Sequence, residues 1–407
     1  MGVSITEALD IIKKEVQKVS FEIVPIENAT TRVCADEIYA KYSLPNYNNS
    51  AMDGYAVKLE DSHTEVKVID TIMAGSSKEP IITNGNCVKI MTGARVPSSA
   101  NAVVPIENIT IIDENTILLP KNIKQNQHIR FIGEDITQGE KILDNGDEIN
   151  FATITMLASQ GITHIRVYAQ PKIAVFTSGD ELKLHYEKIE EYQIYNSNTP
   201  TLLARAKELG ADVTFVGISQ DNPTSLKKMI TNSLYANLII TSGGISVGDA
   251  DFTKEAFNAF ELTTYFDGIT IKPGKPTVFG KINNTYILNL PGNPLAAALI
   301  FELFGKLIVQ QLTGNKNIFH NTIKTKISED LKNKPGRPTV IPGFFDGNHF
   351  KPSEKRLPGM VGVLHNCNSM IVLDKNVDFV AQNSEVEVLP INWKFFTNIQ
   401  KDIFTYV

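Results

Sequence analysis

Glycines and polar side chains stand directly after four apolar runs in the middle of the chain. Each run has the length and composition of a buried strand. In a parallel sheet covered by helices, ligands bind beyond the carboxyl ends of the strands. We therefore expect these segments to meet at one edge of a sheet and to form a ligand site. The segments are Ser178-Gly179-Asp180-Glu181, Gln220-Asp221-Asn222, residues 242–251 and Pro291-Gly292-Asn293-Pro294.

The segment after the third run suits an anionic ligand. Gly243, Gly244 and Gly248 let the backbone approach a ligand closely, and free N–H groups ahead of a helix bind phosphate. Ser242 and Ser246 add hydroxyl donors. The segment therefore predicts a site for a phosphate or another oxyanion.

Charged residues near these segments form two groups. Lys272 and Lys275 stand around a Gly-Pro turn in the crossover before the fourth run and suit neutralisation of an oxyanion. The carboxylates cannot hold an anion directly because like charges repel, but they suit Mg²⁺, which bridges carboxylates to substrate phosphates. A carboxylate can also orient an attacking water. The carboxylates are Glu181, Asp221, Asp249 and Asp251.

Each of these features also has a purely structural interpretation. Ser-Gly-Gly is a common turn, and paired lysines on a loop are usually solvated. Asp251 is a candidate N-cap of the next helix, and Asp221 is another because Pro223 follows it at a helix start. Pro291 to Pro294 suit a helix start that needs no ligand. We favour a site because several strand ends carry such groups together.

Several common catalytic motifs are missing from the sequence. Neither GxGxxG nor GxxxxGK[ST] occurs, which excludes the usual dinucleotide and P-loop signatures. The seven histidines are isolated along the chain, so none is paired with a nearby nucleophile in the sequence. Three widely spaced cysteines favour neither a zinc cluster nor a disulfide framework.

The composition is that of an ordinary globular protein. A net charge of −6 argues against general nucleic-acid binding, and no apolar run reaches the ~20 residues that cross a bilayer. Acidic residues near the start argue against a secretory signal. Gly2 and Thr6 match a loose myristoylation pattern, but Ser4 and Glu7 favour a capping box that opens an amphipathic helix. We expect a cytoplasmic protein without nucleic-acid or membrane partners.

The elements that must position the candidate site follow from the apolar pattern. In residues 171–317, strand-like runs alternate with helical segments; one of these has Pro200 in its first turn and Gly210 at its end. This alternation predicts βαβ units, and therefore a three-layer α/β domain with a mainly parallel sheet.

Three further regions complete a multidomain α/β architecture. Residues 1–44 and 139–170 each contain a predicted helix and are expected to form one discontinuous domain around a β-rich insert, residues 45–138. Residues 318–407 have short strand-like runs separated by Pro and Gly, which predicts a small β barrel or sandwich.

Two segments of the insert suggest a function only when they are considered together with the motifs above. Taken alone, NNSAMDGYA and IMTGARVP with NAVVPIEN are turns next to strands. Together with GEDI, FTSGDEL, TSGGISVGDADFTKEAF, IKPGKP and LPGNPLAAA, they resemble MoeA-type molybdopterin molybdenumtransferases, a family that includes bacterial enzymes and the E domain of gephyrin. The resemblance covers nearly all of residues 1–312, with the motifs in the family's order.

This resemblance implies a function and an assembly. The implied reaction joins adenylyl-molybdopterin and molybdate as substrates, with Mg²⁺ as the divalent metal, and gives molybdenum cofactor and AMP. The implied assembly is an elongated homodimer with a composite active site. Asp53 and Thr92 of one protomer's insert domain would face the α/β domain of the other. Transient partners would be a molybdopterin adenylyltransferase and the molybdoenzymes that accept the product.

Matching motif by motif gives three sets of candidate residues. The catalytic set is Asp53, Thr92, Glu181, Asp221, Asp251, Lys272 and Lys275. The metal-binding set is Glu181, Asp221, Asp249 and Asp251. The substrate-binding set is Asp135, Ser178, Gly179, Asp180, Ser242, Gly243, Gly244, Ser246, Gly248, Pro291, Gly292, Asn293 and Pro294.

Some positions depart from the family pattern. Gly268 stands where a lysine is common, Pro342 stands where a second arginine is frequent, and Arg356 to Gly359 replace a Gln-Gly-Ser stretch. Two alternative functions remain: a molybdopterin adenylyltransferase, whose fold resembles residues 171–312 alone, and a non-catalytic scaffold or binding protein of the same fold. The intact motifs of the insert favour the molybdenumtransferase.

Overall fold

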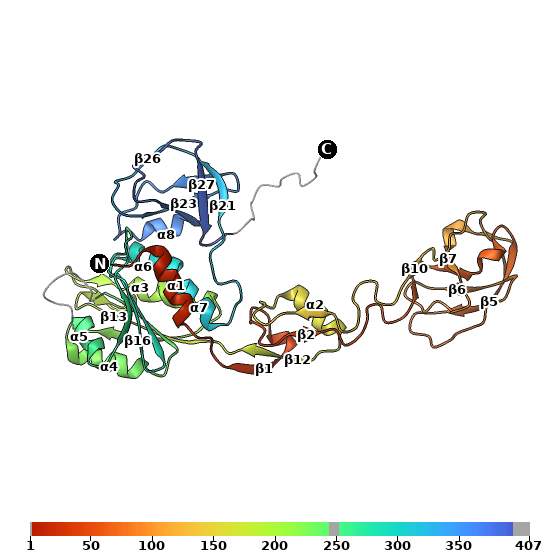
Figure 1. The fold of residues 1–407 in the computed structure, drawn as a ribbon, viewed down its shortest axis with the longest axis horizontal. Coiled ribbons are helices and arrows are strands. Elements are labelled where there is room, and N and C mark those ends of the chain that lie inside the picture. Colours follow the sequence, from red (N-terminus) through yellow and green to blue (C-terminus); the bar gives the residue numbers. More distant parts are fainter. Residues whose placement is uncertain (1, 244–251, 394–407) are drawn as a thin grey trace. The chain divides into compact units, whose positions relative to one another are not determined.

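The computed structural model describes residues 2–243 and 252–393 (Figure 1). The chain divides into two compact units. The first comprises Met1–Ala35, Asn145–Phe151 and His164–Val407, and the second comprises Asp36–Asp144 and Ala152–Thr163. The four domain boundaries expected from the sequence stay a prediction.

The first unit is built around a six-stranded sheet. Its first four strands in spatial order run parallel, and the last two form an antiparallel edge. The predicted mainly parallel sheet is therefore confirmed. The antiparallel edge was not predicted, because its two short strands have no helix between them to mark a βαβ unit. In spatial order the strands are β16 (Asp212–Ser219), β13 (Lys172–Ser178), β17 (Leu238–Ser242), β20 (Thr285–Leu290), β19 (Val278–Ile282) and β18 (Thr263–Asp267).

Helices cover both faces of this sheet (Figure 1). Successive strand residues point to opposite faces, so Val175 joins one apolar core, while Ala174 and Phe176 join the other. This is why the strands are apolar throughout, as in other sheets buried on both sides. The predicted three-layer arrangement is confirmed. One face carries α3 (Asn198–Glu208) and α6 (Pro294–Ile300), and the other carries α4 (Pro223–Ser233) and α5 (Phe252–Asn258).

Helix α1 (Ile5–Glu15) packs its apolar side into the same core as α3 and α6. The predicted capping box is present: Glu7 N donates to Ser4 Oγ at 3.2 Å, and Ser4 N donates to Glu7 Oε2 at 2.7 Å. Both donors would otherwise lack a partner at the first helical turn. The amphipathic helix expected at the start of the chain is confirmed.

The helix that begins at Pro294 continues to Leu312 through η4 (Phe301–Gly305), a π-helical turn, and α7 (Lys306–Leu312). Within the described residues this is a stretch long and apolar enough to cross a membrane, which the sequence reading did not expect. However, 83% of it is buried inside the fold, as in the core helix of a domain. Its apolar character therefore comes from packing against the sheet.

A closed barrel completes the first unit. It confirms the barrel rather than the sandwich among the two architectures predicted for residues 318–407. Its core contains Ile341, Phe350 and Ile371. In spatial order the barrel strands are β21 (Ile323–Ile327), β24 (His349–Pro352), β23 (Thr339–Phe345), β25 (Ser369–Leu373) and β27 (Glu385–Pro390). Beside them lie β22 (Leu331–Lys332), β26 (Phe379–Val380) and α8 (Gly362–Asn366).

Short elements connect the parts of the first unit. Strand β1 (Phe21–Pro25) pairs antiparallel with β12 (His164–Tyr168), so segments far apart in sequence lie side by side. Near the sheet edge, β14 (Leu182–Lys183) pairs in parallel with β15 (Ile194–Tyr195). A 3₁₀ turn, η1 (Ile26–Asn28), follows β1.

The second unit contains the predicted β-rich insert, which is confirmed as a six-stranded sheet. Its spatial order is β7 (Ala102–Pro105), β4 (Gly54–Val57), β6 (Asn86–Ile90), β5 (Glu65–Ile72), β9 (Thr116–Leu118) and β8 (Thr110–Ile111). Smaller pairs are β2 (Ile38–Tyr39) with β11 (Lys141–Leu143), and β3 (Asn49–Ser50) with β10 (Ile129–Arg130). The helical elements are η2 (Leu59–Asp61), η3 (Ile106–Asn108) and α2 (Phe151–Ser159), which ends before Gly161.

Candidate active site

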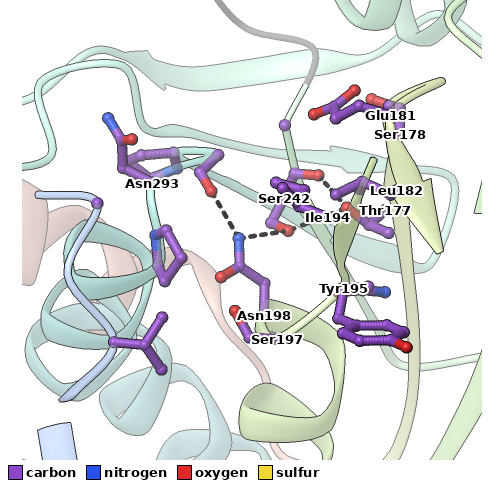
Figure 2. Close-up of a pocket in the computed structure, with 18 of the residues that line it drawn as sticks. Thr177, Ser178, Glu181, Leu182, Ile194, Tyr195, Ser197, Asn198, Ser242 and Asn293 are labelled. Atoms are coloured by element: carbon purple, nitrogen blue, oxygen red, sulfur yellow. Dashed lines mark hydrogen bonds between the residues drawn. The ribbon is translucent and has the colours of Figure 1, made fainter. Parts of the chain in front are cut away.

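A cleft of about 710 Å³ lies at the carboxyl edge of the central sheet (Figure 2). Residues from the ends of β13, β17 and β20 and from the start of α3 line it. Ten predicted site residues belong to this lining: Ser178, Gly179, Glu181, Asp221, Ser242, Gly243, Pro291, Gly292, Asn293 and Pro294. The parallel strands bring these residues together because their carboxyl ends share one edge.

Bare backbone forms part of the cleft surface. Gly243 has φ +93°, and a Cβ built there would meet Ser178 O at 2.8 Å. A Cβ on Gly292 would lie 3.4 Å from Gly243 Cα. No side chain stands between these two glycines, so a ligand can lie directly against peptide groups.

A closed hydrogen-bond network joins the strand ends beneath the cleft. Thr177 Oγ1 donates to Ser242 O at 2.7 Å and lies 3.2 Å from Ser242 Oγ. Asn198 Nδ2 donates to Ser242 Oγ at 3.2 Å and to Gly292 O at 2.8 Å. Figure 2 shows Asn198 bridging the two loops. The network holds the ends of β17 and β20 at a fixed separation.

Asp221 faces the cleft because its neighbour caps the adjacent helix. Asn222 Oδ1 accepts a hydrogen bond from Ser225 N at 2.9 Å at the start of α4. The interpretation of Asp221 as the helix cap is therefore wrong, and its carboxylate is left to line the cleft. Similarly, Asn293 precedes α6 at the cap position but makes no capping bond through its side chain.

The acidic residues of the cleft lie close enough to interact. Burial raises the pKa of Asp221, and the negative charges of Asp180 and Glu181 raise it further. A hydrogen bond from the Ser178 hydroxyl acts in the opposite direction. Asp180 does not line the cleft itself, but its Oδ1 accepts from Asp221 N at 3.3 Å. Crowded carboxylates of this kind suit a divalent cation, which relieves their repulsion.

No group of three or more His, Cys, Asp or Glu side chains is arranged to hold a metal ion within residues 2–243 and 252–393. Glu181 and Asp221 are the members of the predicted metal set that the structure describes. Their oxygen donors fit a hard cation such as Mg²⁺. The remaining predicted residues of this region, Gly244, Ser246, Gly248, Asp249 and Asp251, lie outside the described residues.

The lysine loop is fixed to the barrel through its backbone. Lys272 N donates to Pro338 O and Val340 N donates to Lys272 O, each at 2.8 Å. Pro276 lines the cleft, whereas Lys272 and Lys275 do not. The loop therefore brings two cations to the same sheet edge without placing them in the cleft wall.

Three predicted residues belong to the second unit. Thr92 N and Thr92 Oγ1 each donate to Asp53 Oδ1 at 2.7 Å. These bonds, from the backbone first and the side chain second, lower the pKa of Asp53. Asp135 lines a separate hollow of about 430 Å³ together with Asn49 and Arg130. Asp53 and Thr92 are thus in direct contact, and Asp135 lies in a separate hollow.

The cleft also contains residues that the sequence reading missed. Asn196 and Asn198 line it, as do Tyr195 and the barrel-linked Gly359 and Val361. The two asparagines beside Ser197 could have marked the site in the sequence. They were not proposed because Pro200 follows them, and the start of a helix was enough to explain them. Gly359 lies in a stretch that departs from the family pattern, so no motif marked it.

Comparisons with known proteins agree with this arrangement. A model of the MoeA N-terminal region, domains I and II, matches residues 3–161, and a model of a probable molybdopterin-binding domain matches residues 174–311. A molybdopterin molybdenumtransferase of Haemophilus influenzae is 34% identical over 382 residues, covering 91% of this chain and 94% of its own. The enzyme of that name from Staphylococcus epidermidis is 33% identical over 394 residues, covering 91% of each chain.

Solved structures show the same fold. Two structures of molybdopterin biosynthesis MoeA proteins from Pyrococcus horikoshii superpose with TM-scores of 0.83 and 0.84. They are 26% and 24% identical to this chain, cover 97% and 96% of it, and are themselves covered completely.

Proposed function

This chain belongs to the molybdopterin molybdenumtransferase family, and from that premise we propose that it inserts molybdate into adenylyl-molybdopterin. The products are molybdenum cofactor and AMP. The observation that carries the proposal is the cleft at the carboxyl edge, where a backbone surface at Gly243 and Gly292 lies beside the carboxylates of Glu181 and Asp221.

Each part of the cleft has a role in this reaction. The phosphoanhydride of the substrate lies against the glycine backbone, and Lys272 and Lys275 balance its negative charge. Glu181 and Asp221 would hold Mg²⁺, which would supply positive charge next to the phosphates and molybdate. An oxygen atom of molybdate or of water bonds to the adenylyl phosphorus, the bridging P–O bond breaks and AMP leaves. The two dithiolene thiols bind molybdenum in place of one molybdate oxygen, which leaves either in AMP or as water with the thiol protons. The pKa of Asp221 is raised by burial and by its acidic neighbours, which suits a group that exchanges a proton in the cleft.

We further propose a homodimer with a composite site. Asp53 and Thr92 of each protomer complete the cleft of its partner, as the family resemblance implies. The lowered pKa of Asp53 supports this role because it keeps the carboxylate charged beside a cation or a polarised water. Asp135 adds a substrate contact from the same unit.

The remaining features of the proposed enzyme follow from its composition. We propose a cytoplasmic enzyme; its net charge of −6 argues against general nucleic-acid binding, and the buried long helix gives no reason to expect a membrane partner. A molybdopterin adenylyltransferase would supply the substrate, and molybdoenzymes would accept the product.

The test is molybdenum insertion with purified protein, adenylyl-molybdopterin, Mg²⁺ and molybdate. AMP release and reconstitution of an apo-molybdoenzyme are the readouts. Asp53→Ala and Glu181→Ala run beside the wild type, alone and mixed as heterodimers. Activity in the wild type, loss in each variant and partial recovery in the mixture support the composite site. Pyrophosphate release from ATP and molybdopterin would favour an adenylyltransferase, and substrate binding without AMP release would favour a scaffold.

A further inference from the structure

The two ends of the Asn198 amide have different surroundings. Nδ2 donates to Gly292 O and to Ser242 Oγ. Because a backbone carbonyl can only accept a hydrogen bond, the amide must turn its NH₂ group toward Gly292. The neighbours therefore fix the orientation of the side chain. Neither bond uses Oδ1, and Asn198 is part of the cleft lining (Figure 2).

The hydroxyl of Ser242 is committed to the network rather than to a ligand. Thr177 Oγ1 donates its single hydrogen to Ser242 O at 2.7 Å. In the 3.2 Å contact between the two hydroxyls, Ser242 must then be the donor. Ser242 is 1% exposed and accepts from Asn198 with its remaining capacity. Ser242 is therefore a positioning residue and not the free hydroxyl donor that the sequence predicted. Asn198 is then the outermost member of the network.

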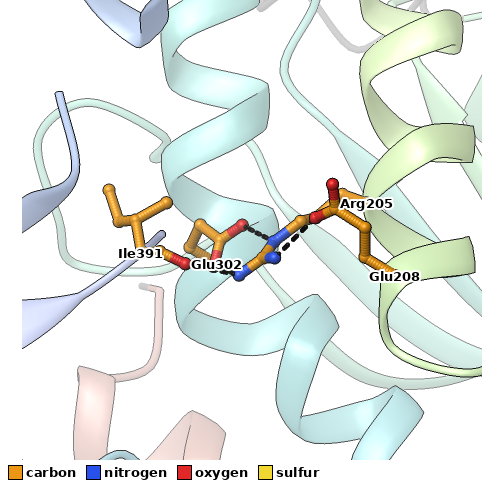
Figure 3. A network of polar contacts seen from close by, with 4 residues as sticks. All are labelled: Arg205, Glu208, Glu302 and Ile391. Carbon is orange, nitrogen blue, oxygen red and sulfur yellow. Dashed lines mark hydrogen bonds and ion pairs between the residues drawn. The ribbon is translucent and has the colours of Figure 1, made fainter. Parts of the chain in front are cut away.

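Helix α3 holds Asn198 on a rigid support. About two turns further along α3, Arg205 Nε donates to Glu302 Oε1 at 2.5 Å, and Arg205 Nη2 donates to Glu302 Oε2 at 3.0 Å (Figure 3). Glu302 lies on the helix that begins at Pro294 in the cleft. The two helices whose first turns flank the cleft are thus tied together by a buried ion pair, which preorganises Asn198.

We propose that Asn198 is both a positioning residue and a recognition residue for the substrate. Nδ2 holds the Gly292 loop against Ser242, so that the backbone surface of the cleft keeps its shape. Oδ1 accepts a hydrogen bond from an amino N–H of a heterocycle in the substrate. This inference rests on the proposed function and deepens it. Adenine and pterin both carry such an amino group, so the shared chemistry is a planar aminoheterocycle.

The first experiment measures binding by equilibrium dialysis. Asn198→Ala is expected to weaken binding of adenylyl-molybdopterin about tenfold, since it removes one ligand bond and loosens the loop. The same loss with AMP assigns the adenine, and the same loss with molybdopterin that lacks the adenylyl group assigns the pterin. Lys207→Ala is the control, because Lys207 is exposed on the same helix α3 and lies outside the cleft lining. Unchanged affinity of the alanine variant for all three ligands, or an equal loss in the control, overturns the proposal.

A second variant separates positioning from simple loss of structure. N198D keeps an acceptor but replaces the NH₂ group with an oxygen that repels Gly292 O. When the introduced carboxyl is protonated, its O–H can donate to Gly292 O again. The affinity of N198D relative to wild type should therefore rise as the pH falls from 8 to 5. Glu181 and Asp221, the charged side chains that line the same cleft, are present in both proteins, so the ratio compares the two side chains at position 198 in the same surroundings. A ratio that does not change with pH overturns the positioning role.

The failure of this inference and the failure of the proposed function are distinguishable. Wild-type release of AMP from adenylyl-molybdopterin with molybdate decides the function, whatever the variants do. The ratio of variant to wild-type affinity decides the role of Asn198, and it is measured with ligand alone. Melting temperatures within about 2 °C of wild type verify that the variants are folded.

Discussion

Thr92 donates two hydrogen bonds to one carboxylate oxygen of Asp53, one from its backbone N and one from Oγ1, and both are 2.7 Å long. The two residues are 39 positions apart and meet because β4 and β6 pair, with Gly54 opposite Ile90. Both bonds favour the charged carboxylate, which explains why the pKa of Asp53 is lowered. Two turns that look unremarkable in sequence are thus one unit in the fold.

Changing Thr92 tests whether this unit supports catalysis. Thr92→Val keeps the backbone donor but loses the hydroxyl, so the pKa of Asp53 should rise toward its ordinary value. AMP release should fall about tenfold, the usual scale for one hydrogen bond to a charged group. Thr92→Ser keeps both donors and should retain activity. An NMR titration of the Asp53 carboxyl measures the pKa, and an unchanged value in the valine variant contradicts the assignment.

Replacing Asp221 should stabilise the folded protein but abolish its activity. Its folded pKa is raised, first by burial and then by Asp180 and Glu181. A raised carboxyl pKa means that the folded state favours the protonated form. The resulting stabilisation is present below the unfolded pKa and is lost as the pH rises through the folded pKa. Asp221→Asn should therefore stabilise the protein at neutral pH, by less than about 1 kcal/mol after solvent screening, while it abolishes AMP release.

The measurement is the melting temperature of Asp221→Asn and wild type between pH 3 and pH 8. The difference should be near zero at the acidic end and should grow with pH. Asp180→Asn is the companion variant: it removes one negative neighbour and should move the acid limb of the pH–activity profile to lower pH. A stability difference that is the same at every pH would show that burial and charge at Asp221 are not its cause.

The site residues that were predicted correctly are those whose position follows from the order and direction of the strands. Ser178, Glu181 and Asp221 follow parallel strands, and a parallel sheet must bring such residues to one edge. Asn198 was missed for a physical reason. It follows only the two-residue strand β15, which lies outside the central sheet, and an asparagine at the start of a helix needs no ligand to explain it. Its role becomes visible only when Gly292 O is found 2.8 Å from its amide.

The edge strands and the barrel segment were harder to predict. β18 and β19 are short and form an antiparallel edge, so no crossover helix announces them. Gly359 reaches the cleft from the far end of the chain, a contact that no local pattern encodes. Such long-range contacts depend on how packed elements meet, whereas strand identity depends on local apolar pattern.

Gly243 should not tolerate a side chain. Its φ of +93° strains any other residue, and a Cβ would meet Ser178 O at 2.8 Å. Gly243→Ala should destabilise the first unit by about 1–3 kcal/mol and should weaken substrate binding, because the methyl group also lies between two strand ends. Gly347→Ala is the matched control: its φ is +100°, but nothing lies within 4 Å of its Cβ. Urea unfolding measures the strain, and equilibrium dialysis measures the loss of binding. Equal binding losses in both variants would contradict the proposal that the substrate binds against the backbone at Gly243.

Replacing only one residue of the Arg205–Glu302 ion pair should lower the free energy of unfolding more than replacing both. The side chains are 19% and 7% exposed. Burial alone would lower the pKa of Arg205, but the hydrogen bonds and charge of Glu302 outweigh it, so the guanidinium stays charged. Arg205→Ala leaves Glu302 buried without its partner and should cost about 3 kcal/mol in urea unfolding. Exposed pairs such as Lys324 with Glu385 should cost less than about 1 kcal/mol.

A double-mutant cycle decides what the pair contributes. Replacing both residues with apolar ones, Arg205→Met with Glu302→Leu, should recover part of the lost stability, because Glu302 is then no longer a buried carboxylate without Arg205. The recovery should be partial because the buried ammonium of Lys306 also loses the nearby negative charge of Glu302. If the pair also holds the first turn of α3 at the cleft, the double variant should bind adenylyl-molybdopterin more weakly than wild type even though it is stable. Stability recovered together with full affinity would mean that the pair serves folding alone. Stability recovered with weakened binding would mean that the geometry of Asn198 depends on a contact two helical turns away.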